Sequence, residues 1–228
     1  IVGSGKKEIK FSQVELNIAK DYAAEDADIT YRLYKIFLKS LKSEKLLNIY
    51  EIFEKPLIKI LASMEINGIK LDNKFLKKLS IKFEKKIQDL EKQIFKISKK
   101  KFNIASTKQL GEIMYNDLKI ASLKKTKKGS FATGAAVLED LAYKGNEFPK
   151  LVLEWRQSSK LKNTYSDSLP EHLNPNTKRV HTSFLLAATT TGRLASSDPN
   201  LQNIPIKTEE GKDIRKAFIS ETNKKLIS

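Results

Sequence analysis

Tyr22 and Asp26 are the first two side chains in this sequence that could act together in chemistry. They lie four residues apart, so in a helix they project from one face. A tyrosine beside a carboxylate can orient a water next to a metal ion that the carboxylate holds. One carboxylate is not a metal site, because hard divalent cations need several oxygen ligands. From the spacing alone, an exposed acidic helix is therefore the favoured interpretation.

A richer candidate is the segment of residues 191–205, which reads TGRLASSDPNLQNIP. It brings Arg, Asn, Gln and hydroxyl side chains together in a turn-rich stretch, and these groups suit contacts to base edges, sugars and phosphates. As chemistry alone it could equally be a polar surface loop. It holds no nucleophile–base pair, His172 and His181 have no obvious carboxylate partner, and no phosphate-binding glycine pattern is present.

The composition excludes several classes of protein. The 228 residues include no Cys, which rules out a disulfide scaffold, a thiolate zinc site and a cysteine nucleophile. No run approaches 18 apolar residues, and the N-terminus lacks a basic-then-apolar signal pattern. We therefore expect a soluble cytoplasmic protein with no membrane span and no secretory signal.

The formal net charge is +16, and its distribution is more informative than its size. Residues 74–128 hold 17 Lys against five acidic residues, a surplus of 12 positive charges in about a quarter of the chain. This concentration of positive charge favours a polyanion as the binding partner. The net charge alone is weak evidence for a nucleic-acid partner. Of the 43 cationic residues, 38 are Lys, and compositional drift in an AT-rich genome would also produce this excess of Lys.

Helical periodicity dominates the first two thirds of the chain. A helix is predicted over 14–41, with Ser12 as its N-cap and Glu15 completing a capping box, and shorter helices over 46–53 and 57–65. The longest periodic stretch places a stripe of apolar residues on one face, with lysines facing outward: Leu76, Leu79, Phe83, Ile87, Leu90, Ile94 and Ile97. This stripe favours a core helix or a helical hairpin over a dimeric coiled coil.

Three further helices are predicted at 106–118, 135–143 and 150–169. Ser106 or Thr107 would cap the first and Thr133 the second. From residue 179 the character changes: Val180, Thr182 and Phe184 alternate, and residues 189–191 are β-branched, which predicts short strands. The fold class is therefore mainly α, with a small β element towards the C-terminal end.

Residues 191–205, continued by 209–219, closely resemble a long motif of the family A DNA polymerases. Three more stretches agree with that family in order and spacing. Residues 22–28 resemble the Tyr-x-x-x-Asp motif that closes its 3′–5′ exonuclease domain, 54–72 resemble the start of its polymerase domain, and 107–111 with 156–165 resemble its thumb. The resemblance covers essentially the whole chain.

This resemblance implies a fragment of a larger α+β polymerase: thumb helices and a small antiparallel β element at the palm side. Residues 1–42 would end the exonuclease domain, 43–170 would form the thumb and connecting helices, and 171–228 would begin the palm. The two metal-binding aspartates of polymerisation and the fingers helix would lie outside this chain. Tyr22 and Asp26 would belong to an incomplete exonuclease site, with Asp26 as a Mg2+ ligand in the intact parent enzyme.

The resemblance also implies a track of contacts to duplex DNA. The residues near phosphates would be Lys124, Lys125, Lys127, Lys128, Ser130, Thr133, Arg156, Lys160 and Thr164. Those facing the minor groove at the primer terminus would be Arg193, Asn200, Gln202 and Asn203. Lys207 stands where an Arg is usual, so it keeps the charge but loses the planar fork. Because all correct base pairs offer similar minor-groove acceptors, such contacts check geometry without reading sequence.

The sequence is thus interpreted as part of a DNA-directed DNA polymerase, a nucleotidyltransferase of DNA replication and repair, that holds double-stranded primer–template DNA. The parent would use deoxynucleoside triphosphates and Mg2+, contact no membrane, and act as a monomer in the cytoplasm at the nucleoid, while the fragment alone would be inactive. Two alternatives remain open: a non-catalytic basic double-stranded DNA-binding module, and an inactive scaffold with a lysine-rich solvated face. An Asp-Tyr-Ser-Gln-like continuation after Ser228 would support the polymerase, and a genuine stop codon would favour the module.

Overall fold

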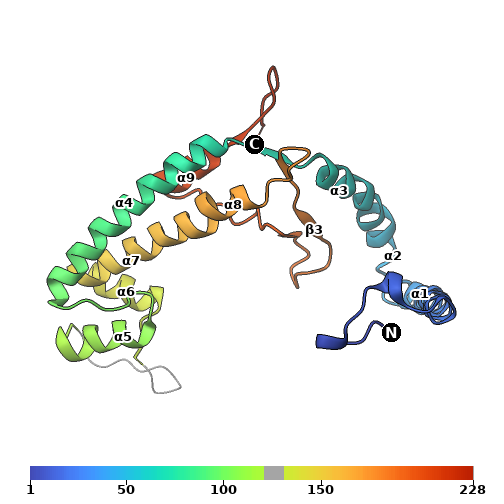
Figure 1. The fold of residues 1–228 in the computed structure, drawn as a ribbon, viewed down its shortest axis with the longest axis horizontal. Coiled ribbons are helices and arrows are strands. Elements are labelled where there is room, and N and C mark those ends of the chain that lie inside the picture. The colour runs from blue at the N-terminus through green and yellow to red at the C-terminus, as the bar shows by residue number, and fades with distance from the viewer. Residues whose placement is uncertain (121–130, 228) are drawn as a thin grey trace. The chain divides into compact units, whose positions relative to one another are not determined.

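The computed structural model describes residues 1–120 and 131–227, and the chain divides into two compact units at Ser63/Met64. Helices form most of both units (Figure 1), and five short strands lie in the described part of the second. This arrangement confirms the predicted fold class, mainly α with a small antiparallel β element.

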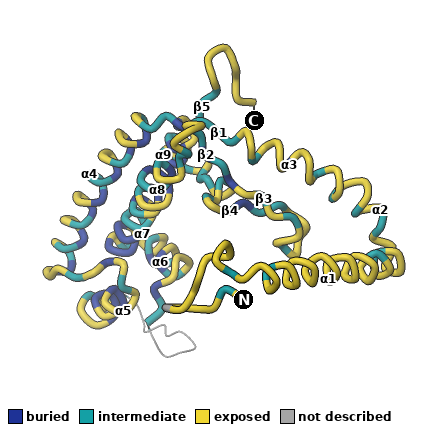
Figure 2. Tube along the Cα trace, turned by 45° about the vertical axis from the view of Figure 1, so that its right-hand side comes forward, coloured by how far each residue is buried: buried dark blue, intermediate teal, exposed yellow. Residues whose placement is uncertain are grey.

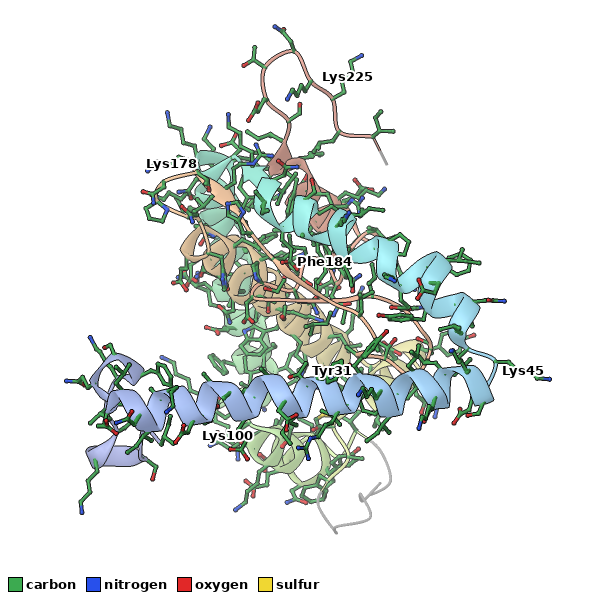
Figure 3. All side chains as sticks on the ribbon, turned by 90° about the vertical axis from the view of Figure 1, so that its right-hand side faces the viewer. Tyr31, Lys45, Lys100, Lys178, Phe184 and Lys225 are labelled. Carbon is green, nitrogen blue, oxygen red and sulfur yellow. The ribbon has the colours of Figure 1, made fainter. Side chains whose placement is uncertain are left out.

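The first unit is built around the long helix α1 (Leu16–Ser43). Two 3-10 turns precede it, η1 (Gly5–Lys7) and η2 (Phe11–Gln13). Three helical segments follow it: α2 (Leu47–Ile49), the π-helical η3 (Tyr50–Glu54) and α3 (Lys55–Asn67), whose last four residues belong to the second unit. None of the α1 residues is buried, as Figure 2 shows by the exposed colour along the helix. On its surface, Lys35 Nζ lies 4.3 Å from the ring centroid of Tyr31, which Figure 3 labels.

The capping prediction for α1 is wrong. Ser12 lies inside η2, and the N-cap is Glu15, whose carboxylate accepts hydrogen bonds from the amides of Asn17 (3.1 Å) and Ile18 (3.3 Å). A carboxylate has two oxygens and can satisfy two of the free amides at a helix start. The helix therefore begins two residues later than the periodicity predicted.

In the second unit, the helical segments that follow α3 are α4 (Asn73–Ser98), α5 (Thr107–Gly111), the π-helical η4 (Glu112–Asp117), α6 (Ala135–Tyr143), α7 (Glu147–Lys160), the π-helical η5 (Leu161–Asp167), α8 (Ser168–Glu171) and α9 (Glu209–Lys216). α4 and α7 lie side by side (Figure 1). As predicted, Ser106 caps α5 by accepting from the amide of Gln109.

The apolar stripe of α4 is core, as predicted. Leu76, Leu79 and Phe83 join a cluster with Leu161, Tyr165, Leu169 and Ile214, while Leu90 and Ile94 join a second cluster with α5, η4, α6 and α7. At 1.5 Å per residue the helix is about 39 Å long, so one stripe can connect both clusters. Figure 2 shows the buried colour along one side of α4.

Two small antiparallel sheets complete the second unit. One has the order β2 (Arg179–Val180), β1 (Ile69–Leu71), β5 (Phe218–Ile219), with Ile69 opposite Val180 and Lys70 opposite Ile219. The other pairs β3 (Ser183–Leu185) with β4 (Ala195–Ser197). Strands near Val180 and Phe184 were predicted, but β1, β4 and β5 were not.

Two local predictions fail in this unit. The β-branched residues 189–191 form a turn, in which the Thr189 hydroxyl donates to the carbonyl of Arg193 at 2.9 Å. A threonine hydroxyl that bonds nearby backbone competes with strand pairing. Thr133 does not cap α6, because the N-cap is Gly134 and no side chain bonds the first amides.

Candidate nucleic-acid interface

A groove of about 700 Å³ runs between α7 and the segment that leads into α9, and we call it the basic groove. Its lining residues are Arg156, Gln157, Lys160, Leu161, Gln202, Asn203, Ile204, Pro205, Ile206, Lys207 and Thr208. Five of the contacts predicted from sequence, Arg156, Lys160, Gln202, Asn203 and Lys207, therefore meet on one surface. Residues about 45 positions apart in the chain come together there because η5 and the 202–208 segment share one apolar cluster.

Arg156 and Lys160 belong to the α7 wall of the groove, one helical turn apart. Arg156 Nη1 donates to the backbone carbonyl of Thr133 at 2.7 Å, and burial lowers the pKa of its guanidinium from the ordinary value. A guanidinium has five N–H donors, so this bond leaves others for a ligand. Lys160 is exposed and, within the described part of the chain, has no acidic partner.

A half-buried lysine–carboxylate pair anchors η5, which continues this wall. Lys162 Nζ lies 2.7 Å from Asp167 Oδ2 and 3.4 Å from Glu84 Oε2 on α4. The hydrogen bond that Lys162 donates to Asp167 is the main reason that the pKa of Lys162 is raised. Burial acts to raise the pKa of Asp167, but hydrogen bonds from Lys162 and Ser80 outweigh it and the pKa is lowered. Lys162 bonds Glu84 and Asp167 bonds Ser80, both on α4, so the pair holds η5 against α4. It thereby also holds Leu161, which lines the groove.

Backbone hydrogen bonds hold the opposite wall, residues 202–208. The hydroxyl of the buried Tyr165 donates to the carbonyl of Asn203, and the amide of Leu201 donates to Ser196 Oγ at 3.0 Å. At the other end, the hydroxyl of Thr208 caps α9 by accepting from the amide of Gly211 at 3.2 Å. Gln202 and Asn203 are exposed between these anchors.

Ion pairs fix α9 to α4 and thereby fix the end of this wall. Lys86 Nζ lies 2.7 Å from Glu210 Oε1, and Lys82 Nζ lies 3.1 Å from Asp213 Oδ2. The hydrogen bond from Lys86 lowers the pKa of Glu210. Hydrogen bonds from Lys216 and then Lys82 lower the pKa of Asp213. Two lysines that face outward on α4 thus serve the fold.

Several predicted contacts do not lie in the groove. Arg193 is exposed in the turn between β3 and β4, and Thr164 is exposed on η5, but neither lines the basic groove. Asn200 accepts from the amide of Gln202 at 3.0 Å through Oδ1, so this oxygen serves the loop itself. Lys124, Lys125, Lys127, Lys128 and Ser130 lie outside the described residues.

Thr133 is one of the residues predicted to lie near duplex phosphates. Its side chain is only 4 % exposed, and its carbonyl accepts from Arg156. A buried hydroxyl cannot reach a phosphate on the surface, whereas a carbonyl can hold a guanidinium in place. Thr133 is thus a support for Arg156.

Tyr22 and Asp26 lie on α1 in the first unit, both exposed. The Tyr22 ring lies 6.2 Å from that of Phe11, centroid to centroid. Within residues 1–120 and 131–227, no group of three or more His, Asp or Glu side chains could hold a metal ion. The residues that the structure describes therefore do not form a complete Mg2+ site.

Sequence reasoning missed the apolar part of the groove. Leu161, Ile204, Pro205 and Ile206 line it between the polar groups. The Asn-Ile-Pro stretch gave a signal for Ile204 and Pro205, since it directly follows the predicted contacts. No local signal marked Leu161, because its position follows from packing within the second unit.

The fold and the groove define a mainly helical protein with a basic groove on its surface. No described helix is long and apolar enough to cross a membrane. The chain belongs to DNA polymerase family A, since the model of that family matches residues 73–228. This confirms the resemblance seen in the sequence.

Curated relatives share this assignment. DNA polymerase I of Rhizobium leguminosarum is 48% identical over 228 residues, covering 100% of this chain and 22% of the relative. DNA polymerase I of Pseudomonas aeruginosa is 44% identical over 229 residues, covering 100% of this chain and 25% of the relative. The chain thus spans about a quarter of the length of these relatives.

A solved structure is also similar. It is the POL domain of Pol1 from M. smegmatis in complex with DNA primer-template and dNTP, with a TM-score of 0.72 and 36% sequence identity. The match covers 79% of this chain and 32% of that chain.

Proposed function

We propose that this chain is the part of a DNA-directed DNA polymerase that holds the primer–template duplex. The observation that carries the proposal is the basic groove, where Arg156, Lys160 and Lys207 meet the amides of Gln202 and Asn203. The names of the relatives, and the primer-template DNA held by the M. smegmatis structure, support it.

The side chains of the groove suit both the phosphate backbone and the base pairs of a duplex. Cations bind phosphates whatever the base sequence, and each phosphate contact releases counterions. Side-chain amides can donate to the acceptors that every base pair presents in the minor groove. The groove would therefore bind duplex DNA without sequence preference and sense the geometry of the last base pairs.

The proposal extends to parts of the chain outside the groove. Arg193 and Asn200 would approach the primer terminus from the β3–β4 side, and Thr164 would continue the phosphate track, as would the basic residues at 124–130. Residues 1–42, 43–170 and 171–228 would be the exonuclease end, the thumb region and the start of the palm. Tyr22 and Asp26 would complete an exonuclease site only with residues outside this chain.

For the whole enzyme we propose deoxynucleoside triphosphates as substrates, Mg2+ as cofactor, a monomeric state and a place at the nucleoid in the cytoplasm. Its reaction would be template-directed nucleotidyl transfer in replication and repair. A non-catalytic DNA-binding module would lose only duplex affinity when groove residues are changed. In the full polymerase, the same changes should also lower the rate of nucleotide incorporation.

The test titrates this chain onto labelled duplex at several salt concentrations. The double variant Lys160→Ala/Lys207→Ala removes one cation from each wall. The control, Lys77→Ala/Lys150→Ala, removes two exposed lysines outside the groove, one of them from α7 itself. Each lost phosphate contact should reduce the slope of log K on log salt by about 0.9.

We expect the groove variant to lose about two units of this slope, and the control to keep nearly the wild-type slope. Equal losses in both variants would show that binding follows net charge and not the groove. An affinity that ignores salt would remove the electrostatic basis of the proposal.

A further inference from the structure

Tyr165 is a large polar side chain in an otherwise apolar cluster. It is 2 % exposed, and its neighbours in that cluster include Leu76, Leu161 and Ile214. Burial raises the pKa of its phenol, so the hydroxyl stays protonated and remains a donor. A buried hydroxyl without a partner is costly, and its partner here is the backbone carbonyl of Asn203.

This hydrogen bond acts at the middle of one groove wall. Leu201 and Ile204, on either side of the exposed pair Gln202 and Asn203, pack against the cluster that contains Tyr165. Among the described residues, the bond from Tyr165 is the one hydrogen bond to the backbone of residues 203–207. The other anchors, Ser196 on Leu201 and Thr208 on Gly211, hold the ends of the segment.

We propose that Tyr165 is a positioning residue for polymerisation. Its hydroxyl fixes the backbone at Asn203, and so sets how far Gln202 and Asn203 reach into the basic groove towards the primer-terminal base pairs. Tyr165 acts through these two amides and touches no DNA. This inference rests on the proposed function, because the amides need a duplex in the groove.

Loss of this hydrogen bond should affect the rate and accuracy of nucleotide incorporation more than the affinity for the duplex. Duplex affinity is spread over many cation–phosphate contacts, none of which uses the hydroxyl. Alignment of the primer end is more sensitive, since a misplacement of about 1 Å can cost on the order of 100-fold in rate. Phenylalanine at position 165 keeps the ring in the cluster and deletes only the oxygen.

The test uses the full polymerase chain that contains these residues, with Tyr165→Phe compared with the parent. Single-turnover incorporation is measured at saturating nucleotide on matched and mismatched primer ends, and duplex affinity at equilibrium. Ser98→Ala is the matched control: it deletes a hydroxyl that is 5 % exposed and donates to the carbonyl of Lys100 at 2.7 Å, away from the groove.

We expect Tyr165→Phe to slow matched incorporation roughly 10- to 100-fold, to reduce discrimination against a mismatched end, and to change duplex affinity by less than about twofold. Ser98→Ala should leave rate and discrimination unchanged. In a background of Gln202→Ala/Asn203→Ala, which already lacks the amides, Tyr165→Phe should cost little more.

Three results would overturn the inference: an unchanged rate in Tyr165→Phe, an equal loss in Ser98→Ala, or a full additional loss in the background without the amides. Its failure can be distinguished from failure of the proposed function. If Lys160→Ala/Lys207→Ala weakens duplex binding while Tyr165→Phe has no effect, the function stands and the positioning role is wrong. If neither change matters, the groove does not hold the duplex.

Discussion

Arg156 on α7 and Thr133, just before α6, are joined by a hydrogen bond of 2.7 Å from Nη1 of the guanidinium to the backbone carbonyl. The bond links one wall of the basic groove to a buried residue 23 positions away in the sequence. It gives Arg156 two tasks, one in the fold and one at the proposed duplex surface.

Arg156→Ala should therefore lower both stability and duplex affinity. Losing a hydrogen bond from a charged donor, and leaving the carbonyl unpaired, should reduce the free energy of unfolding by about 1–3 kcal/mol. Arg156→Lys keeps the charge without the fork, so it should recover more of the affinity than of the stability. Urea denaturation and duplex titration on the three proteins check this, and full recovery of stability by lysine would contradict it.

Arg193→Ala, in the full polymerase, should lower incorporation far more than duplex affinity. The proposed role is to donate to minor-groove acceptors at the primer end, and Arg193→Lys should rescue poorly because it lacks the planar fork. A rival role is a salt bridge that braces the turn before Asp198-Pro199. Arg193 is exposed, and within residues 1–120 and 131–227 no acidic side chain pairs with it, so stability should change by less than about 0.5 kcal/mol. Equal falls in rate and affinity would refute the alignment role.

The ion pairs between α4 and α9 predict a dependence of stability on pH. Because folding lowers the pKa values of Glu210 and Asp213, the unfolded chain binds more protons near these values. The two carboxylates therefore contribute fully to the free energy of unfolding at pH values above their unfolded pKa of about 4. This contribution is lost as the pH falls through their pKa values in the folded state. Asp213→Asn should cost about 0.5–1 kcal/mol at pH 7, since its lysine partners are exposed, and the difference should shrink near pH 3 and in high salt.

Urea unfolding at pH 7, 5 and 3 measures this prediction. Glu139→Gln is the control, because Glu139 is exposed on α6 away from the α4–α9 pairs. A cost of Asp213→Asn that stayed constant down to pH 3 would rule out the carboxylate as its cause.

Gly211 permits the close approach of α9 to the groove wall. A Cβ at this position would lie 2.7 Å from Pro205 Cβ and 3.0 Å from its carbonyl oxygen. Gly211→Ala should therefore destabilise the chain by about 1–3 kcal/mol and weaken duplex binding. Gly134→Ala is the control for the steric effect, because nothing lies within 4 Å of an added Cβ there. Its expected cost is about 0.5–1 kcal/mol, because Gly134 is the N-cap of α6 and alanine is a poorer N-cap. Thermal unfolding of both variants tests this prediction, and equal shifts of their midpoint temperatures would contradict the steric explanation.

The chain of 228 residues by itself should show no polymerase activity and no Mg2+-dependent exonuclease activity. In-line phosphoryl displacement commonly uses two metals about 4 Å apart, and Asp26 alone cannot hold them. The assay supplies primed template, nucleotides and Mg2+, with a mock preparation from the same host as control. Extension or trimming above that control would show that the chain carries a metal site we did not identify.

The sequence by itself determined the parts of this protein that depend on near neighbours. The stripe from Leu76 to Ile94 predicted the core face of α4, because helical periodicity is a property of a single segment. Ser106 could be recognised as a cap for the same reason, since a cap bonds amides two or three residues away. The motif at residues 191–205 indicated the family, and with it five of the residues that line the groove.

Only the tertiary structure decided the rest, because the deciding partners are distant in the chain. β1 is three residues long and pairs with Val180 and Ile219, more than 100 residues away, so no local pattern marks it. Thr133 was predicted as a cap, but packing places it buried, with its carbonyl bonded to Arg156, and Gly134 is the N-cap. Tyr165 lies within the helix predicted over 150–169, but no local pattern indicated its partner. Its hydrogen bond to Asn203 exists because η5 and the 202–208 segment share one cluster.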